Sequence, residues 1–444
     1  MKLKNIAQHI HAETQDVIDQ EVSGVSIDSR VTRPDELFFA LPGEHVDGHS
    51  YVAKAIEHGA AGAVVSQWQA IDAPQLKVKD TTVALAQLSR VWREQFHLPV
   101  VAITGSQGKT TTKNILASIC RAASSENEVL ASRKSFNNHL GVPLTLCQLN
   151  SRHRYGVFEI GMNHSGEIER LVALVKPDIA VITMISSTHI GQFASLDEIA
   201  QAKAEIFSGL SDDGVAVINR DDQYYETFCN IARPKRIVSF GQSHEANIHL
   251  VSFDRQHIVI QTPKGKIDTT LPLLGRHNIV NALAAVAAAF SLEIPLLAIE
   301  EGLAHVMPEY GRCEPKSFAK DVLLIDDSYN ASPISVSAAI DILAEYPGRK
   351  IMVFGGMGEL GDKAEVFHRE VAYQLSQKGV SHLMTYGDMP RATFNAFEGN
   401  KSHYDTHDAL ADALSSLLQP NDTVLIKGSR SARMEKVIDM IRSS

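Results

Sequence analysis

The sequence predicts an α/β protein of three domains with a central, doubly wound and mostly parallel sheet. Its 444 residues exceed what one hydrophobic core usually organises, because domains commonly hold about 100–200 residues. Between residues 82 and 310, apolar runs of strand length alternate with helical segments, a pattern typical of parallel strands joined by helical crossovers. We therefore expect domains at residues 1–81, 82–310 and 311–444.

The first of these ranges has the pattern of a small α/β module. Apolar runs at residues 24–27, 37–41 and 62–65 are separated by turn residues, and a helical segment covers residues 51–58.

The central range begins with a helical segment at residues 82–96 and continues with strongly apolar strands. These strands are expected at residues 100–104, 156–160, 178–184 and 215–219. Their near-continuous hydrophobicity indicates strands that are buried on both faces of a sheet.

Two further segments complete the central range. Residues 247–273 predict two or three alternating strands at an antiparallel edge, with Thr262-Pro263-Lys264-Gly265 as a hairpin turn. The alanine-rich run 277–290 predicts a helix that carries Asn278 and Asn281 on one face.

From about residue 311 a second alternating series begins, with a helical segment after each strand. Its strands are expected at residues 322–326, 350–354, 382–386 and 423–426. This predicts a C-terminal domain that is Rossmann-like.

Composition and charge exclude several classes of protein. With 44% hydrophobic and 21% charged residues, the chain has the composition of a globular protein, and its net charge of −10 gives no attraction for nucleic acid. The most apolar stretch, residues 279–299, is interrupted by polar residues and a proline, so we expect no membrane insertion. The four cysteines are scattered, and the N-terminus lacks an apolar signal segment. We therefore expect a cytoplasmic protein, and we expect it to be a monomer.

The sharpest local motif is Val100 to Thr112, where a buried strand enters a glycine loop that opens a helix. Backbone amides of such a loop converge on phosphate oxygens, and the helix N-terminus adds a partial positive charge. Lys109 would neutralise the β- and γ-phosphates, and Thr110 would hold magnesium. The first glycine of the standard loop is replaced by Ile103, and a chance Gly-Lys-Thr in a strand-turn-helix is the alternative. The nucleotide-binding residues expected in this loop are Gly105, Ser106, Gln107, Gly108, Lys109, Thr110 and Thr111.

The shorter loop Thr104 to Thr110, followed by Phe158 to Asn163 and Gly166-Glu167-Ile168, resembles the Mur ligase family. The resemblance implies a ligase that uses ATP and magnesium to form an amide bond. It also implies metal-site roles for Glu159, for His189 and for Lys203, the last as a carbamate formed with carbon dioxide. From the residues alone, Glu159 could equally be a solvated loop glutamate, whereas the sequence favours a packed or surface histidine at position 189 and a solvated helix lysine at position 203.

The same resemblance assigns residues to the adenine, the ribose and the γ-phosphate of ATP. Asn278, with Asn281 one turn further on, matches the family helix that contacts adenine. Arg312 matches an arginine near the γ-phosphate, and Asp327 matches the aspartate that binds the ribose. The C-terminal domain would then close over ATP and bind the incoming amino substrate.

Other segments resemble particular members of the family. Ser29, Arg30 and the run Asp47-Gly48-His49 resemble the UDP-sugar-binding part of the members that process a tripeptide. The run with Asn137 and Asn138, the run with Asn330 and the run with Arg430 resemble the members that add D-alanyl-D-alanine. These would be substrate-binding residues. The resemblance implies that D-alanyl-D-alanine is joined to UDP-N-acetylmuramoyl-tripeptide through an acyl phosphate.

Two alternatives stay open at this point. The chain could be another Mur-type amino acid ligase or a ligase like the folylpolyglutamate synthetases. It could also be a P-loop ATPase switch, which would hydrolyse ATP without an acceptor and a donor.

Overall fold

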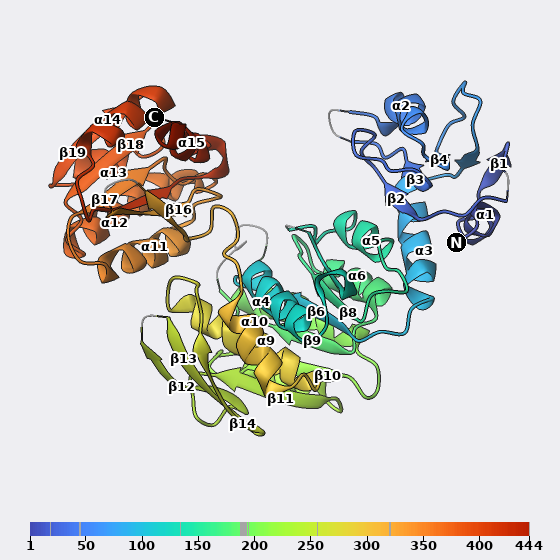
Figure 1. The fold of residues 1–444 in the computed structure, drawn as a ribbon, viewed down its shortest axis with the longest axis horizontal. Helices are drawn as coiled ribbons and strands as arrows, with labels where there is room; N and C mark the ends of the chain where they lie inside the picture. Colours follow the sequence, from blue (N-terminus) through green and yellow to red (C-terminus); the bar gives the residue numbers. More distant parts are fainter. Residues whose placement is uncertain are drawn as a thin grey trace. The chain divides into compact units, whose positions relative to one another are not determined.

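The residues that the structure describes form three β-sheets flanked by helices, with strands within residues 13–77, 100–270 and 314–427 (Figure 1). The computed structural model describes residues 1–443 except 18, 44–45, 134, 187–192, 194, 255 and 319–320. The chain divides into a first unit of Met1–Phe253, His257–Thr269 and Val280–Ala304, and a second unit of Asp254–Gln256, Thr270–Ile279 and His305–Ser444. The predicted α/β class with mostly parallel sheets is confirmed.

The N-terminal sheet has the order β1-β5-β4-β3-β2, in which β2 to β5 are parallel and β1 is antiparallel. Its elements are α1 (Leu3–His9), β1 (Glu13–Gln15), β2 (Gly24–Ser26), β3 (Glu36–Phe39), η1 (Gly48–Tyr51), α2 (Val52–Glu57), β4 (Gly62–Val65) and β5 (Gln75–Lys77). The three predicted apolar runs form β2, β3 and β4, whereas β1 and β5 were not predicted.

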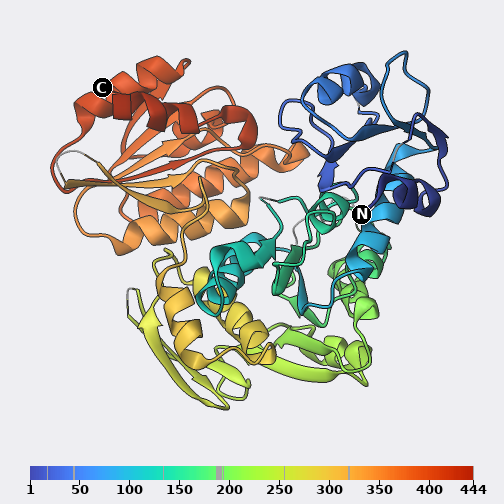
Figure 2. The same cartoon turned by 45° about the vertical axis from the view of Figure 1, so that its right-hand side comes forward.

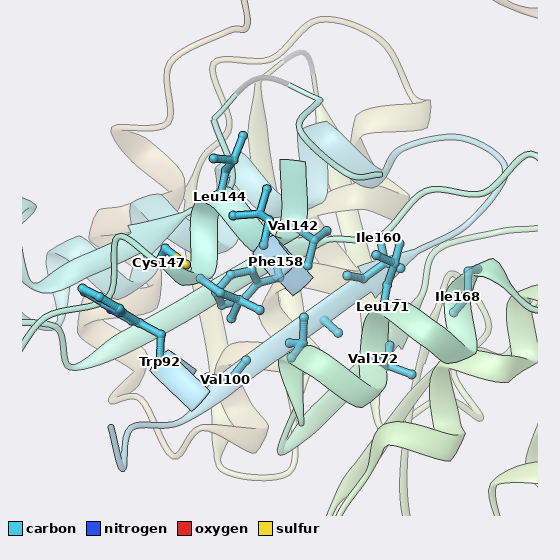
Figure 3. Packing of buried hydrophobic residues seen from close by; sticks show 14 of the residues in the cluster. Trp92, Val100, Val142, Leu144, Cys147, Phe158, Ile160, Ile168, Leu171 and Val172 are labelled. Atoms are coloured by element: carbon cyan, nitrogen blue, oxygen red, sulfur yellow. The ribbon is translucent and has the colours of Figure 1, made fainter. Parts of the chain in front are cut away.

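Helix α3 (Thr81–Glu94) follows this sheet and packs against the central part of the first unit. The Asp80 side chain caps it by accepting hydrogen bonds from the N–H groups of Thr82 and Val83. Near its C-terminus, the Trp92 indole donates to the carbonyl of Leu149 at 2.9 Å. Figure 3 shows Trp92 at one side of a buried cluster, near Cys147, with Phe158 at its centre.

The central sheet has the order β14-β13-β12-β11-β10-β9-β6-β8-β7, and its strands from β7 to β12 pair in parallel. Its first elements are β6 (Val100–Thr104), α4 (Lys109–Ala122), η2 (Glu126–Glu128), β7 (Val129–Ala131), α5 (Gly141–Leu146), β8 (Tyr155–Glu159), α6 (Glu167–Val175), β9 (Ile179–Ile182), α7 (Leu196–Ala204) and η4 (Glu205–Gly209). The next are β10 (Val215–Asn219), α8 (Tyr225–Ala232), β11 (Arg236–Gly241), β12 (Ile248–Asp254), β13 (His257–Thr262), β14 (Gly265–Thr270), α9 (His277–Ser291) and α10 (Leu296–Ala304). The predicted hairpin joins β13 to β14.

Helix α10 approaches α4 closely at a glycine. A methyl group on Gly302 would lie 2.3 Å from the Cα of Ile119, so only hydrogen fits there. The hydroxyl of Ser118 also donates to the carbonyl of Gly302 at 2.8 Å. The backbones of α4 and α10 are therefore in direct contact near Ser118 and Ile119, in the C-terminal half of α4.

The C-terminal sheet has the order β15-β16-β20-β17-β18-β19, in which only β15 is antiparallel among the pairs described. Its elements are β15 (Glu314–Phe318), β16 (Val322–Asp327), α11 (Pro333–Glu345), β17 (Lys350–Phe354), η6 (Gly361–Lys363), α12 (Ala364–Gln377), β18 (His382–Tyr386), α13 (Arg391–Ala396), β19 (Asn400–Tyr404), α14 (His407–Leu417), β20 (Thr423–Lys427), η7 (Arg430–Ala432) and α15 (Glu435–Ser443). The ribbon of this sheet is orange to red in Figure 2. The edge strands β15 and β19 were not predicted.

Alternate side chains of the C-terminal strands enter two separate clusters. Met352 and Phe354 pack with α11 and α12, while Ile351 and Val353 pack with α14 and α15. The sheet is therefore covered by helices on both faces, as in other doubly wound folds. In the described ranges, no helix has both the length and the apolar character needed to cross a bilayer.

Candidate nucleotide-binding site

The phosphate loop lies at the C-terminal end of β6, between the parallel neighbours β8 and β9. Ligands of doubly wound sheets bind at this edge. Gly108 has φ +79°, and a Cβ there would lie 2.1 Å from Oδ1 of Asn281. The loop thus requires glycine both for its backbone conformation and for the close approach of α9.

Hydrogen bonds with the residues that follow β9 fix the shape of the loop. The N–H of Ser106 donates to the carbonyl of Met184 at 2.8 Å, and its hydroxyl donates to the carbonyl of Ser186 at 3.1 Å. The hydroxyl of Thr183 donates to the carbonyl of Gln107 at 2.5 Å. The loop is therefore shaped before any ligand binds.

Lys109 is the first residue of α4, and its ammonium folds back over the loop. Nζ donates to the carbonyls of Gly105 at 2.7 Å and Ser106 at 3.4 Å. The next residue, Thr110, is buried and Thr111 is half-buried. A lysine, a helix N-terminus and a glycine loop together form an arrangement suited to a polyphosphate.

Glu159 ends β8, next to Ile103 of β6 in register. It is 1% exposed, and its Oε1 accepts a hydrogen bond from the Asn137 amide at 2.7 Å. Its Oε2 is buried and accepts no hydrogen bond from the described residues. A buried carboxylate oxygen of this kind needs a cation or a donor, so the donor type fits a hard divalent ion such as magnesium.

Lys203 lies at the end of α7 and is 2% exposed. Burial, together with the charge of nearby Lys109, holds the pKa of Lys203 well below its ordinary value. The sequence alone favoured a solvated lysine here, and the structure shows that this reading is wrong.

His189 falls outside the described residues, so the structure does not place this candidate metal ligand. Among the residues that are described, no three His, Cys, Asp or Glu side chains gather into a metal-binding group.

The two asparagines of α9 have different surroundings. Asn278 donates from Nδ2 to the carbonyl of Leu274 at 2.7 Å, and Asn281 lies against Gly108 of the phosphate loop. Asn138 is used locally as well, because its Oδ1 accepts from the N–H groups of Leu140 and Gly141 at the start of α5.

The candidate residues of the N-terminal sheet lie in two tight turns. Arg30 is exposed and pairs with Asp28, and its hydrogen bonds lower the pKa of Asp28 to about 2. The carbonyl of neighbouring Ser29 lies 2.5 Å from Nδ1 of His58.

The second turn is the run that contains Gly48. Asp47 caps η1, and its Oδ1 lies 2.6 Å from Nδ1 of His49. Nε2 of His49 accepts the N–H of Ser66 at 2.9 Å. Internal contacts thus engage the imidazole at both nitrogens.

In the second unit, Asp327 and Lys427 are register partners at the C-terminal ends of β16 and β20. Nζ of Lys427 donates to Asp327 Oδ2 at 2.5 Å and to the carbonyl of Asn330 at 2.9 Å. Asp327 Oδ1 accepts the N–H of Cys313. This buried lysine fixes both Asp327 and the turn that carries Asn330.

Two candidate arginines lie near one exposed aromatic ring in the same unit. The guanidinium of Arg312 is 4.7 Å from the ring centre of Tyr329, and that of Arg430 is 5.9 Å away. Arg430 also pairs with Glu435, and its N–H donates to Oδ1 of Asn330 at 3.4 Å. Two cations on one ring form a surface suited to an anion or a planar group.

Sequence reasoning missed several residues that hold these sites together, namely Lys113, Ser132, Thr183, Tyr329 and Lys427. Tyr329 and Lys427 belong to the runs that were assigned to substrate binding through Asn330 and Arg430. The remaining three carry no signal in spacing or composition, because their importance arises from contacts between segments far apart in the chain.

Comparison with known proteins identifies the family. Residues 21–93 match the Mur ligase family catalytic domain, residues 103–289 the Mur ligase middle domain and residues 311–430 the Mur ligase glutamate ligase domain. The UDP-N-acetylmuramoyl-tripeptide–D-alanyl-D-alanine ligase of Escherichia coli is 37% identical over 448 residues, covering 98% of both chains. The ligase of the same name from Bacillus subtilis is 33% identical over 458 residues, covering 99% of this chain and 98% of its own.

Solved structures agree with the sequence relatives. A crystal structure of MurF from Acinetobacter baumannii matches with a TM-score of 0.92 at 32% identity, covering 100% of this chain and 99% of that one. The chain therefore belongs to the Mur ligase family, and it is an ATP-dependent ligase that forms a carbon–nitrogen bond.

Proposed function

We propose that the enzyme joins D-alanyl-D-alanine to UDP-N-acetylmuramoyl-tripeptide, with ATP and magnesium, in the synthesis of a peptidoglycan precursor. The observation that carries the proposal is similarity along the whole chain to ligases of that name, 37% identical over 98% of its length. The γ-phosphoryl group passes to the terminal carboxylate of the tripeptide. The dipeptide amine then attacks the acyl phosphate, phosphate leaves and an amide remains.

We assign the phosphate loop, Gly105 to Thr111, to the triphosphate. Lys109 would exchange its two loop carbonyls for phosphate oxygens, because charged acceptors form the stronger bonds. Asn278 and Asn281 are assigned to adenine, Arg312 to the γ-phosphate and Asp327 to the ribose.

Glu159, Thr110, His189 and Lys203 are assigned to magnesium, which would supply charge neutralisation for the phosphoryl group. The lowered pKa of Lys203 supports carbamate formation, because the neutral amine is the form that reacts with carbon dioxide. The resulting anion suits a magnesium site better than an ammonium does.

The remaining assignments concern substrates and domains. Ser29, Arg30, Asp47, Gly48 and His49 would serve the UDP-sugar, while Asn137, Asn138, Asn330 and Arg430 would serve the peptide portions. We propose the ranges 1–81, 82–310 and 311–444 as the corresponding domains. We also propose a cytoplasmic location, which the four unpaired cysteines support because thiols stay reduced there, and we propose that the enzyme is a monomer.

A substrate-dependence assay tests the function. ADP release should require ATP, UDP-N-acetylmuramoyl-tripeptide and D-alanyl-D-alanine together, and the peptide product should appear with it. ADP release at the full rate without either cosubstrate would instead indicate an ATPase switch. Release with the tripeptide and a single amino acid would indicate another ligase of the family.

The variant Lys109→Ala tests the nucleotide site. We expect turnover to fall by about a thousandfold or more, because the lysine neutralises the transferred phosphoryl group. Thermal unfolding should stay near that of the parent, since this side chain is not part of the core. Lys176→Ala, which removes a surface lysine paired with Glu94, is the matched control and should keep full activity. Normal turnover of Lys109→Ala would refute the assignment.

A further inference from the structure

We propose that Lys113 is a positioning residue that acts as the counter-charge of Glu159 when no metal ion is bound. In this role it holds the carboxylate in place and, at the same time, weakens the binding of magnesium. The proposal rests on the assignment of Glu159 to magnesium in the proposed function.

Lys113 lies one helical turn after Lys109 on α4, and its side chain is 2% exposed. Its Nζ donates to the carbonyl of Ser132 at 2.8 Å and lies 4.0 Å from Oε2 of Glu159. The hydroxyl of Ser132 accepts the N–H of Glu159 at 3.1 Å. Ser132, the residue that follows β7, therefore links Lys113 to Glu159.

The two oxygens of Glu159 have different surroundings. Oε1 accepts a hydrogen bond from Asn137, whereas Oε2 accepts none from the described residues. The ammonium of Lys113 is too far from Oε2 for a hydrogen bond but close enough for strong attraction, because both groups are buried. The charge of the carboxylate is thereby balanced while the oxygen remains open to another ligand.

A divalent ion on Oε2 would reverse the effect of Lys113. Its positive charge would approach a buried ammonium, and like charges repel strongly where water is excluded. The same lysine that stabilises the metal-free state therefore disfavours the metal-bound state. A lysine that only filled space would affect stability without changing metal affinity.

The test compares the parent with Lys113→Met, a substitution that keeps most of the volume and removes the charge. Thermal unfolding is followed while magnesium chloride is titrated at constant ionic strength, and Mn²⁺ binding is measured by electron paramagnetic resonance. We expect Lys113→Met to unfold at a lower temperature without metal. We also expect its metal dissociation constant to be about tenfold lower, with a larger stabilisation by magnesium.

Three further variants separate charge from packing. Ser118→Ala removes another contact of α4, so it should lower stability but leave the metal dissociation constant unchanged. Glu159→Gln should abolish the response to metal. The double variant Lys113→Met, Glu159→Gln should be more stable without metal than Lys113→Met, and should fold even if the single variant does not.

Two results would overturn the proposal. One is a Lys113→Met enzyme that binds metal no more tightly than the parent does. The other is a double variant that is no more stable than Lys113→Met, which would show that Lys113 acts by packing. If magnesium does not stabilise the parent enzyme, the assignment of Glu159 to magnesium in the proposed function is refuted. The comparison of Lys113→Met with the double variant in the absence of metal would still decide whether Lys113 balances the charge of Glu159.

Discussion

Lys203, which we propose as a magnesium ligand, lies in an environment that the sequence does not reveal. It stands in an ordinary helical run, yet its amine is buried and lies near another lysine. A buried amine with a lowered pKa spends more time neutral, which favours reaction with carbon dioxide.

We predict that Lys203→Ala loses most activity, by about a hundredfold or more, because the anionic metal ligand is lost. Formate or acetate should restore part of the activity by filling the vacated space with a carboxylate. Lys203→Arg should stay inactive, since guanidinium cannot form the carbamate. Initial rates with and without each acid provide the measurement. A fully active Lys203→Arg enzyme would refute the carbamate.

At this scale, sequence reasoning succeeded where a motif constrains local geometry and failed where contacts are long-range. Gly108 and Lys109 could be found because a glycine loop opening a helix has a local signature. Lys113 could not be found, because its partners lie far away in the sequence: Ser132 follows β7, and Glu159 is the last residue of β8.

At the scale of elements, an ion pair between a buried carboxylate and a half-buried guanidinium joins the starts of two central strands of the C-terminal sheet. Arg349, which precedes β17, donates to both carboxylate oxygens of Asp422, which precedes β20. Its Nη2 also donates to the carbonyl of Leu417 at the end of α14. The pair therefore connects β17, β20 and α14 at the end of the sheet where these two strands begin.

We predict that Asp422→Asn lowers the free energy of unfolding by about 2 kcal/mol at pH 7, because a half-buried guanidinium loses its partner. Burial raises the pKa of Asp422, but hydrogen bonds from Arg349 and from the Gln419 N–H outweigh it, so the pKa lies below 3.8. This contribution is present above the unfolded pKa and is lost as pH falls through the lower folded value.

Urea unfolding of the parent and Asp422→Asn from pH 7 down to pH 3 provides the measurement. The difference between them should stay constant down to about pH 5 and shrink below about pH 4. Asp405→Asn, at an exposed carboxylate of the same unit, is the control and should change little. A difference that does not depend on pH would contradict the ion-pair explanation.

Most interior strands were predicted to within about two residues, but the interior strands β5 and β11 were not predicted, and neither were the edge strands β1, β7, β15 and β19. The strands β6, β10, β17 and β18 match their predicted ranges because their buried central residues are mostly apolar. By contrast, β15 contains a proline and a lysine, and β19 reads Asn-Lys-Ser-His-Tyr. Such strands are fixed by hydrogen bonds to a neighbour, which short-range composition does not encode.

At the scale of the whole molecule, the second unit has a core of its own. Its two hydrophobic clusters cover both faces of the C-terminal sheet, and nearly all their residues lie between 313 and 441. The sequence predicted this independence from the second alternating series, although the exact domain boundary at 310 stays a prediction.

We predict that residues 305–444 fold when expressed alone. Circular dichroism should show one cooperative thermal transition, and amide resonances should be well dispersed, because Leu274 is the one residue of the two described clusters that lies outside the fragment. Val353→Asp in this fragment, which puts a charge into one cluster, should abolish the transition. A fragment without cooperative unfolding would show that the unit depends on the rest of the chain.

The contact of Gly302 with Ile119 limits how freely the phosphate loop could be moved to another protein. Helix α4 begins with the loop lysine, yet its position is set partly by a glycine more than 180 residues later in the chain. If only residues 100–122 were transferred, the host protein would have to supply a glycine-like surface against which the backbone of α4 could pack directly. The smallest transplantable module is therefore discontinuous in sequence, and it includes α10 along with the loop.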